Sequence, residues 1–331
     1  MTVQLTVIGL NQIGISMGLA LKSGEYPINR VGSDADLLAE RKALKLGAFE
    51  TVVHNLPAAV ENADIVVLCL PVDEVRKTLE AISTVLKPGA VVLETSVLKT
   101  ASLNWAADVL PEDRHLLSFT PTLNPDYLDE RLNGEEDAHA DLFKKSVILI
   151  GASENTHPDA VKLAADFSTL LGAKPFFADL VEAEGLTALV HHLPQISAIA
   201  LYRAIEGQPG WREARKIGGR PLVNALSPLE NLDENKEFGQ ALLHNSENTV
   251  RVIDNLVLEL KKMREMVSSQ DAEALKAYME GAVEGRIDWV KKRQTLDWEH
   301  MPRPELPTTG QWLGKLVGLG GKLKDFDKPK K

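Results

Sequence analysis

The sequence has little of several features that would assign it to a specialised class of protein. It contains one cysteine, Cys69, so neither an internal disulfide nor a cysteine-based zinc cluster can form within the chain. No apolar run approaches the roughly 20 residues of a membrane-spanning helix. Residues 1–21 also lack the basic start and cleavage pattern of a secretory signal. We therefore expect a protein of the cytoplasm that does not span a membrane.

The chain also lacks an excess of positive charge. Its 37 Lys and Arg residues stand against 47 Asp and Glu residues, which gives a net charge of −10. Such a charge opposes nonspecific binding to nucleic acid, so we expect no nucleic-acid partner. The eight histidines include no His-x-x-x-His spacing of the kind that holds zinc on a helix, and we expect no metal site.

What the sequence does contain is the composition of a globular chain of about two domains, with 331 residues, 44% hydrophobic and 25% charged. Short runs rich in Val, Ile and Leu alternate with helical stretches in the N-terminal half, which is typical of buried parallel strands joined by helices. The fold class is therefore α/β, with a doubly wound parallel sheet of the Rossmann type over residues 1–178. The predicted strands are 3–9, 30–33, 64–70, 90–95, 115–119, 146–150 and 174–177.

Beyond about residue 179 the strand pattern stops, and long stretches with helical periodicity follow at 181–206, 236–267 and 271–293. Residues 179–301 are predicted to form an all-α domain for substrate binding and dimerisation. Pro194 should kink or interrupt the first of these helices. Long amphipathic helices in so small a domain favour a homodimer. Residues 302–331 form a flexible basic tail in this interpretation.

A candidate cofactor site follows the first predicted strand, where the sequence reads Gly9-Leu10-Asn11-Gln12-Ile13-Gly14. This resembles the Gly-x-Gly-x-x-Gly turn that binds a dinucleotide, with Asn11 at the middle glycine position. Asp34 ends the second strand, where a carboxylate accepts the ribose hydroxyls of NAD and repels the 2′-phosphate of NADP. We therefore expect NAD, with NADP disfavoured. The predicted cofactor residues are Gly9, Asn11, Gln12, Ile13, Gly14, Asp34, Leu70 and Pro71.

Five stretches together resemble the prephenate and arogenate dehydrogenases of tyrosine biosynthesis. They are residues 9–21, Val66 to Val72, Leu142-Phe143, the Val-His-His-Leu-Pro run at 190–194, and Gly-Trp-Arg-Glu at 210–213. The resemblance implies an NAD-dependent oxidation in which a cyclohexadienyl carboxylate loses a hydride and its carboxylate and becomes a 4-hydroxyphenyl product. It also implies that His192 contacts the substrate. Cations for the substrate carboxylate would come from Arg212, Arg215 and Lys216.

The same resemblance places two departures at the reacting centre. The family's catalytic His-Pro motif aligns with Thr120-Pro121, and threonine cannot act as a base near pH 7. The family's Asp-x-Gly-Ser-x-Lys parallels residues 94–99, where Val97 occupies the serine position and Ser96 lies one residue away. The candidate catalytic residues are thus Thr120, His192 and Ser96. Two alternatives stay open: a dehydrogenase of another small carboxylate, and a noncatalytic dinucleotide-binding regulatory protein.

Overall fold

The computed structural model describes residues 2–22, 27–128, 134–230, 232 and 237–298. The chain divides into two compact units, of which the second runs from Leu180 to Trp289 and the first contains the rest. The second unit thus ends within the stretch expected to form the helical domain. The predicted tail at 302–331 lies outside the described residues.

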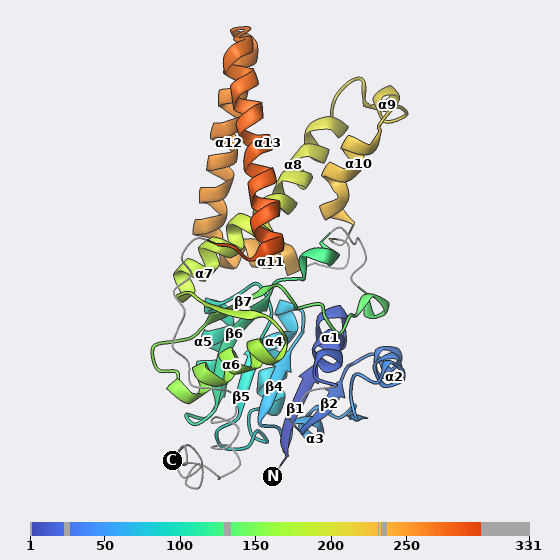
Figure 1. The fold of residues 1–331 in the computed structure, drawn as a ribbon, viewed down its shortest axis with the longest axis vertical. Helices are drawn as coiled ribbons and strands as arrows, with labels where there is room; N and C mark the ends of the chain where they lie inside the picture. The colour runs from blue at the N-terminus through green and yellow to red at the C-terminus, as the bar shows by residue number, and fades with distance from the viewer. Residues whose placement is uncertain (1, 23–26, 129–133, 231, 233–236, 299–331) are drawn as a thin grey trace, which may run out of the picture. The chain divides into compact units, whose positions relative to one another are not determined.

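The first unit is built on one eight-stranded sheet with the order β3-β2-β1-β4-β5-β6-β7-β8, flanked by helices (Figure 1). This confirms the predicted α/β fold of the Rossmann type. The strands are β1 (Val3–Ile8), β2 (Ile28–Ser33), β3 (Thr51–Val52), β4 (Ile65–Leu68), β5 (Val91–Glu94), β6 (His115–Pro121), β7 (Val147–Gly151) and β8 (Lys174–Phe177). The two-residue β3 was not predicted because so short a strand has no periodicity to detect.

The last two strands depart from an all-parallel sheet. β7 pairs antiparallel with β6, and β8 runs parallel to β7, so both point opposite to the other six strands. The reason lies in the connection that follows β6, because Thr122 and Val147 hydrogen-bond to each other at the edge where β6 ends. The chain therefore enters β7 at that same edge and runs back across the sheet.

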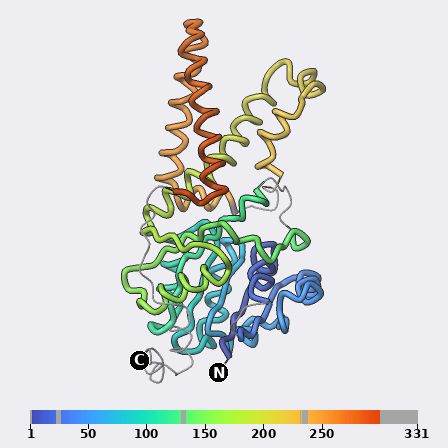
Figure 2. Tube along the Cα trace, in the orientation of Figure 1, coloured from blue at the N-terminus to red at the C-terminus, as the bar shows by residue number. Residues whose placement is uncertain are grey.

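Among the described residues of the first unit, six α-helices lie between successive strands, and their inner faces complete its core. They are α1 (Gln12–Ala20), α2 (Leu37–Leu46), α3 (Leu56–Val60), α4 (Val72–Ile82), α5 (Thr100–Val109) and α6 (Pro158–Leu170). The strands contribute fully buried side chains such as Leu5, Val67 and Phe119, as expected for a sheet covered on both faces. Figure 2 follows this backbone from the blue first strand through the green β7.

In the residues that the structure describes, the second unit contains helices and no strand. They are α7 (Leu180–Thr187), α8 (Leu193–Glu206), α9 (Trp211–Ala214), α10 (Arg220–Leu226), α11 (Glu237–His244), α12 (Ser246–Ser268) and α13 (Ala272–Thr295), whose last residues belong to the first unit. A π-helical turn at Ala188–His192 lies between α7 and α8, just before Pro194. There the Leu193 N–H donates to the Ala188 carbonyl, so the chain stays helical up to Pro194. Proline has no backbone N–H and could not donate such a bond itself.

Candidate cofactor and active site

The turn after β1 requires glycine at its first position. Gly9 has a φ of +92°, a backbone conformation that side-chain-bearing residues rarely adopt. A Cβ atom built there would lie 2.3 Å from the carbonyl oxygen of Cys69, which follows β4. The Gly9 N–H also donates to the Ser33 carbonyl at the end of β2. The turn therefore packs directly between the carboxyl ends of the two strands that flank β1.

Gly14 brings the first helix against this turn. A Cβ atom at Gly14 would lie 2.2 Å from the Gly9 carbonyl oxygen, so any larger residue would push α1 away from β1. This close approach of helix and turn is the role of the last glycine in a dinucleotide-binding turn. Both glycines predicted from the sequence thus occupy positions that only glycine fits.

Asn11 takes the position of the middle glycine without backbone strain, because its φ of −79° and ψ of −174° are ordinary extended values. Its side chain caps α1 by accepting from the Gly14 N–H at 3.1 Å, and it donates to the Cys69 carbonyl at 3.0 Å. In the described part of the chain, the N–H groups of Gln12 and Ile13 have no hydrogen-bond partner. Two donors at a helix N-terminus are what a phosphate group binds.

Asp34 lies directly beside this turn. Its carboxylate accepts from the Leu10 N–H at 2.6 Å and from the Asp36 N–H at 2.8 Å, so it joins the glycine turn to the start of α2. The side chain is half-buried at the carboxyl end of β2. A ribose bound against the turn would therefore meet a carboxylate that the backbone already holds in place.

The residues after β4 border the candidate cofactor site on the side opposite Asp34. The side chain of Leu70 approaches the position where a Cβ of Gly9 would be, at 3.2 Å, and Pro71 immediately precedes α4. Burial raises the pKa of the Cys69 thiol to about 12, so this cysteine is packed rather than nucleophilic. Three features of this edge together fit the diphosphate and ribose of a dinucleotide. They are the turn at Gly9 and Gly14, which admits no side chain, the N–H groups at the start of α1, and the carboxylate of Asp34.

The same edge of the sheet continues into a buried polar cluster. The register aligns Ile8, Leu68, Glu94 and Ser118 across four neighbouring strands, so the carboxyl ends of β1, β4, β5 and β6 lie side by side. The Lys99 ammonium, which is 0% exposed, donates to Thr120 Oγ1 and to the Ser96 carbonyl. This contact brings the predicted residue Thr120 together with the loop that carries Ser96.

Ser96 and Glu94 complete the cluster in different ways. The Ser96 hydroxyl accepts from the Leu98 N–H at 3.3 Å, and the Ser96 N–H donates to the Glu94 carboxyl. Burial raises the pKa of Glu94, while the charge of Lys99 and the hydrogen bonds from Ser96 and Ser102 act in the opposite direction. One carboxyl oxygen of Glu94 is buried without a hydrogen-bond partner among the described residues.

His192 occupies a buried position of the second unit. It is 1% exposed, its Nδ1 lies 3.5 Å from Thr249 Oγ1, and its ring meets Phe238 edge to face. Its Nε2 is buried with no hydrogen-bond partner in the described chain, and burial lowers its pKa. His191, on the same π-helical turn, is exposed. The imidazole is thus neutral near pH 7, with one ring nitrogen left for a further partner.

The three predicted substrate cations lie together at α9 and are all exposed. The Lys216 ammonium pairs with Glu213 at 2.5 Å, and the Arg212 guanidinium lies 4.0 Å from the same carboxylate. Arg215 is exposed as the residue that follows α9. Within the second unit, His192 is therefore buried, whereas the three cations at α9 lie on the surface.

Sequence reasoning did not select Lys99 or Glu94, although both residues lie in the segment at 94–99 that carried the resemblance. A lysine after a strand reads as a solvated residue in a sequence. Only the fold, which aligns β5 beside β6, shows that the loop after β5 buries Lys99 against Thr120.

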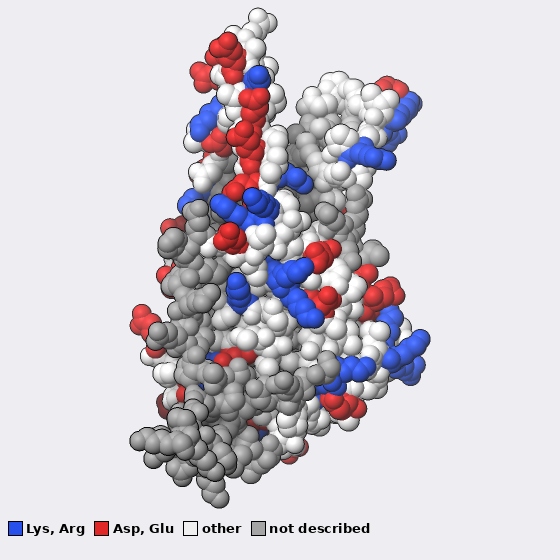
Figure 3. All heavy atoms as spheres, in the orientation of Figure 1, with Lys and Arg blue, Asp and Glu red and all other residues white. Residues whose placement is uncertain are grey.

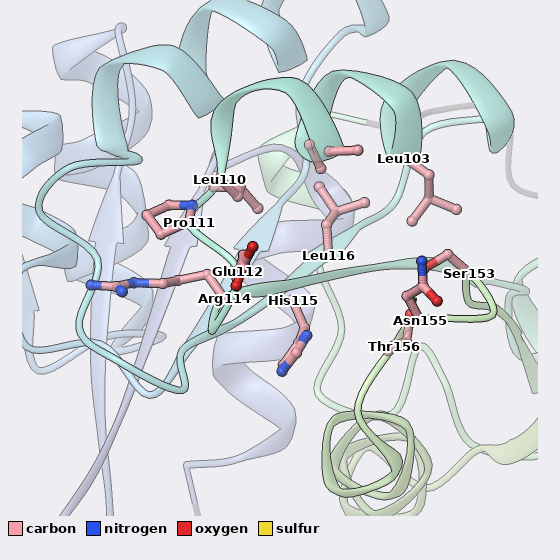
Figure 4. Close-up of a pocket in the computed structure, with 12 residues that line it drawn as sticks. Leu103, Leu110, Pro111, Glu112, Arg114, His115, Leu116, Ser153, Asn155 and Thr156 are labelled. Atoms are coloured by element: carbon pink, nitrogen blue, oxygen red, sulfur yellow. Dashed lines mark hydrogen bonds between the residues drawn. The ribbon is translucent and has the colours of Figure 1, made fainter.

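A separate pocket lies at the opposite edge of the sheet, near the first residue of β6 (Figure 4). Its volume is about 190 Å³, and its walls come from α5, the start of β6 and the loop before α6. Glu112 lines it near Leu110 and Arg114, and Asn155 lines it beside Ser153 and Thr156 (Figure 4). None of the catalytic, substrate-binding or cofactor-binding residues predicted from the sequence lines this pocket.

Two further searches of the described residues concern membranes and metals. No helix there is both long and apolar enough to cross a membrane. Among those same residues, no group of three or more His, Cys, Asp and Glu side chains could hold a metal ion. The face in Figure 3 mixes basic and acidic side chains rather than gathering positive charge in one area.

Comparison with known proteins agrees with this geometry. Residues 17–176 match the nucleotide-binding domain of prephenate dehydrogenase. The chain is 24% identical over 285 residues to the cyclohexadienyl dehydrogenase of Zymomonas mobilis, with 86% of this chain and 94% of that protein covered. It is also 24% identical to the prephenate dehydrogenase of Bacillus subtilis, with coverages of 86% and 76%.

Solved structures show the same fold. The prephenate dehydrogenase of A. aeolicus, in complex with hydroxyphenyl propionate and NAD+, superimposes with a TM-score of 0.75 at 19% identity, covering 87% of this chain and 98% of that one. The arogenate dehydrogenase of Synechocystis gives 0.69 at 19% identity, with coverages of 86% and 99%. The matches confirm the predicted fold and nucleotide-binding domain, and they support the resemblance of this chain to the prephenate and arogenate dehydrogenases.

Proposed function

We propose that this protein is an NAD-dependent dehydrogenase that carries out the oxidative decarboxylation of a cyclohexadienyl carboxylate, either prephenate or arogenate, in tyrosine biosynthesis. The observation that carries the proposal is the cradle at the carboxyl edge, where Gly9 and Gly14 admit no side chain and α1 presents two open N–H groups. The matched proteins act on substrates of this class. We also propose a cytoplasmic location, which the single cysteine supports.

The chain's own residues divide the work of binding the cofactor. The N–H groups of Gln12 and Ile13 hold the diphosphate, and Asn11 keeps α1 fixed behind them through its cap. Asp34 accepts the ribose hydroxyls and disfavours a 2′-phosphate, while Leu70 and Pro71 border the groove. NAD supplies the acceptor for the hydride that leaves the ring.

The remaining predicted residues hold the substrate. Thr120 hydrogen-bonds the ring oxygen, with Ser96 in the neighbouring loop. The unpartnered Nε2 of His192 offers a second polar contact. Arg212, Arg215 and Lys216 supply positive charge for a carboxylate, although Lys216 lacks the planar fork that pairs with both carboxylate oxygens.

The direct test is NAD reduction, followed by absorbance at 340 nm, with purified protein and prephenate, arogenate or simple hydroxy acids. We expect turnover with prephenate or arogenate. Turnover with hydroxy acids alone would transfer the function to another small carboxylate. NAD binding without turnover on any substrate would instead favour a regulatory protein.

We further propose that the second unit forms a homodimer. Apolar side chains recur on one side of α12 at Val250, Val257, Leu260, Met263 and Val267, and along α13 at Met279, Val283 and Ile287. All are at least 37% exposed. Stripes with this helical spacing pack against other helices in stable proteins. A second copy of the chain would cover them. Sedimentation velocity of the wild-type protein at micromolar concentration should give the mass of two chains.

A further inference from the structure

The segment at 134–142, which lies between β6 and β7 in the sequence, packs against the helix that begins the candidate cofactor site. The Gln12 side-chain amide donates to the Asp137 carbonyl at 2.9 Å, and the His139 N–H donates to the Ser16 hydroxyl at 3.0 Å. Gln12 and Ser16 are four residues apart, so they lie on one face of α1. Gln12 is 5% exposed and Ser16 is fully buried. The segment thus covers the first two turns of α1.

The other end of this segment is held by residues that follow β6. The Asn124 N–H donates to the Leu142 carbonyl at 2.6 Å, and Asn124 Nδ2 donates to the Asp141 carbonyl at 3.1 Å. The Tyr127 hydroxyl donates to the Asp141 carboxylate at 2.6 Å, and its ring stacks on His139 with 4.2 Å between the ring centres. These contacts connect the segment to the chain directly after β6, so fixing the segment on α1 also fixes that part of the chain.

Charge contributes little to this packing. The Lys42 ammonium on α2 pairs with the Glu135 carboxylate at 2.9 Å, and the hydrogen bond between them raises the pKa of Lys42. The lysine side chain is 47% exposed, and exposed ion pairs of this kind are screened by solvent and salt. The attachment of the segment therefore depends on the buried hydrogen bonds to Gln12 and Ser16.

Gln12 is bonded to the segment through its side chain and meets the candidate cofactor site through its backbone. In the described part of the chain its N–H group has no hydrogen-bond partner, and it is one of the two that the proposed function assigns to the diphosphate. A dinucleotide bound there restricts the motion of the first turn of α1. The same restriction favours the bond from Gln12 to Asp137, so the dinucleotide and the segment both stabilise one arrangement of this turn.

We propose that Gln12 is a positioning residue that couples the dinucleotide site to the segment at 134–142, so that NAD+ binding and attachment of the segment stabilise each other. This inference rests on the proposed function, which places the diphosphate at the start of α1. Coupling between two sites is reciprocal. NAD+ should therefore make the segment harder to open, and loss of the attachment should weaken NAD+ binding. The segment does not need to touch the dinucleotide for this effect.

The test is hydrogen–deuterium exchange of the full-length protein, followed by mass spectrometry, with and without saturating NAD+. The His139 N–H, which donates to Ser16, reports opening of the segment. In the wild type NAD+ should slow exchange in 134–142 by about fivefold or more, the lower end of ordinary coupling between two sites. Gln12→Met keeps the backbone N–H and removes the side-chain donor, so the slowing should be lost while NAD+ still binds.

Gln4→Met is the matched control. The side-chain amide of Gln4, on β1, donates to the Ala59 carbonyl at 3.2 Å, so this variant loses the same kind of bond at a different place. It should keep the full effect of NAD+ on 134–142. Lys42→Met removes only the exposed ion pair and should keep it as well. If Gln12→Met does not fold, Ser16→Ala tests the same attachment, because it removes the acceptor of the His139 N–H.

The affinity for NAD+ gives the reciprocal readout on the same variants. Calorimetric titration should show NAD+ binding about fivefold weaker in Gln12→Met than in the wild type, because the coupling is lost. The affinity of Gln4→Met should equal that of the wild type.

The outcomes separate this inference from the proposed function. Exchange in 134–142 that NAD+ does not change in the wild type, or slows equally in Gln12→Met, would overturn the coupling and leave the dehydrogenase assignment standing. Loss of the effect in Gln4→Met as well would also overturn it, because the effect would then not depend on the bond from Gln12. A wild type that binds no NAD+ would overturn the proposed function and this inference with it.

Discussion

The two units of the chain differ in how much apolar surface each buries by itself. In the first unit large side chains such as Leu5, Phe119 and Phe143 are fully buried between the sheet and its helices. In the described part of the second unit, the buried apolar residues are Ala183, Ala188, Ala198, Ala241 and Val252. A unit that buries mainly alanines gains little hydrophobic stabilisation from its own packing. The first unit thus has a large apolar core of its own, and the small core of the second is the reason for the proposed dimer.

The largest expected effect concerns the core of the first unit. Phe119 on β6 is fully buried, and its ring centre lies 5.6 Å from that of Phe167 on α6. Phe119→Ala should lower the free energy of unfolding by about 3–5 kcal/mol, because it leaves a cavity. Phe177→Ala, at a residue 38% exposed, should change it by less than about 1 kcal/mol. Urea denaturation of the two variants measures the contrast, and equal losses would contradict a core centred on β6.

The next effect concerns the apolar stripe of α12. Leu260 is 54% exposed, and Leu260→Glu should weaken self-association by about 2 kcal/mol or more, because it buries a carboxylate in the proposed dimer interface. Lys261→Glu changes the charge of a neighbouring exposed residue and should leave the dimer intact. Sedimentation equilibrium measures both variants. A wild type that is monomeric at all concentrations would contradict the dependence of the second unit on a partner.

The smallest effect is a pH dependence that each unit shows through one histidine. Burial lowers the pKa of His192 in the second unit, and burial together with His157 lowers that of His115 in the first. The unfolded chain then binds protons more readily than the folded one. The stability that these histidines contribute is therefore present above about pH 6.5 and is lost as the pH falls through their folded-state values.

Replacing either histidine by glutamine removes its titration. Urea unfolding between pH 8 and pH 5 should show a shallower loss of stability for His192→Gln and for His115→Gln than for the wild type. Identical slopes in the wild type and both variants would show that neither histidine is held neutral by the fold.

Much of the first unit could be predicted from the sequence because its elements carry local signals. Continuous apolar runs identify the buried strands, and Gly9 and Gly14 identify the turn. The antiparallel β7 could not be predicted, because strand direction depends on the path of the connection after β6 and not on the residues of β7 itself. The π-helical turn before Pro194 was equally hidden, since the sequence shows the proline but not how the preceding turn adapts to it.

The site was predictable to a different degree in its two parts. The candidate cofactor residues of the turn, 9–14, follow one another along the chain, so their spacing alone suggests them, and Asp34, Leu70 and Pro71 are suggested by their places at the ends of predicted strands. The cluster of Glu94, Lys99 and Thr120 forms only when β5 and β6 lie side by side, and Lys99 becomes informative only once its burial is known. Contacts between strands determine this chemistry, and a single sequence does not contain them.

The proposed function requires a nicotinamide dinucleotide bound along the carboxyl edge of the first unit, with its ribose at Asp34. Calorimetric titration of NAD+ into the wild type, Asp34→Ala and Asp36→Ala tests it most directly. We predict saturable binding of one NAD+ per wild-type chain, about tenfold weaker binding in Asp34→Ala, and unchanged affinity in Asp36→Ala, which loses only the cap of α2. No heat of binding in the wild type, or equal affinity in all three proteins, would contradict it.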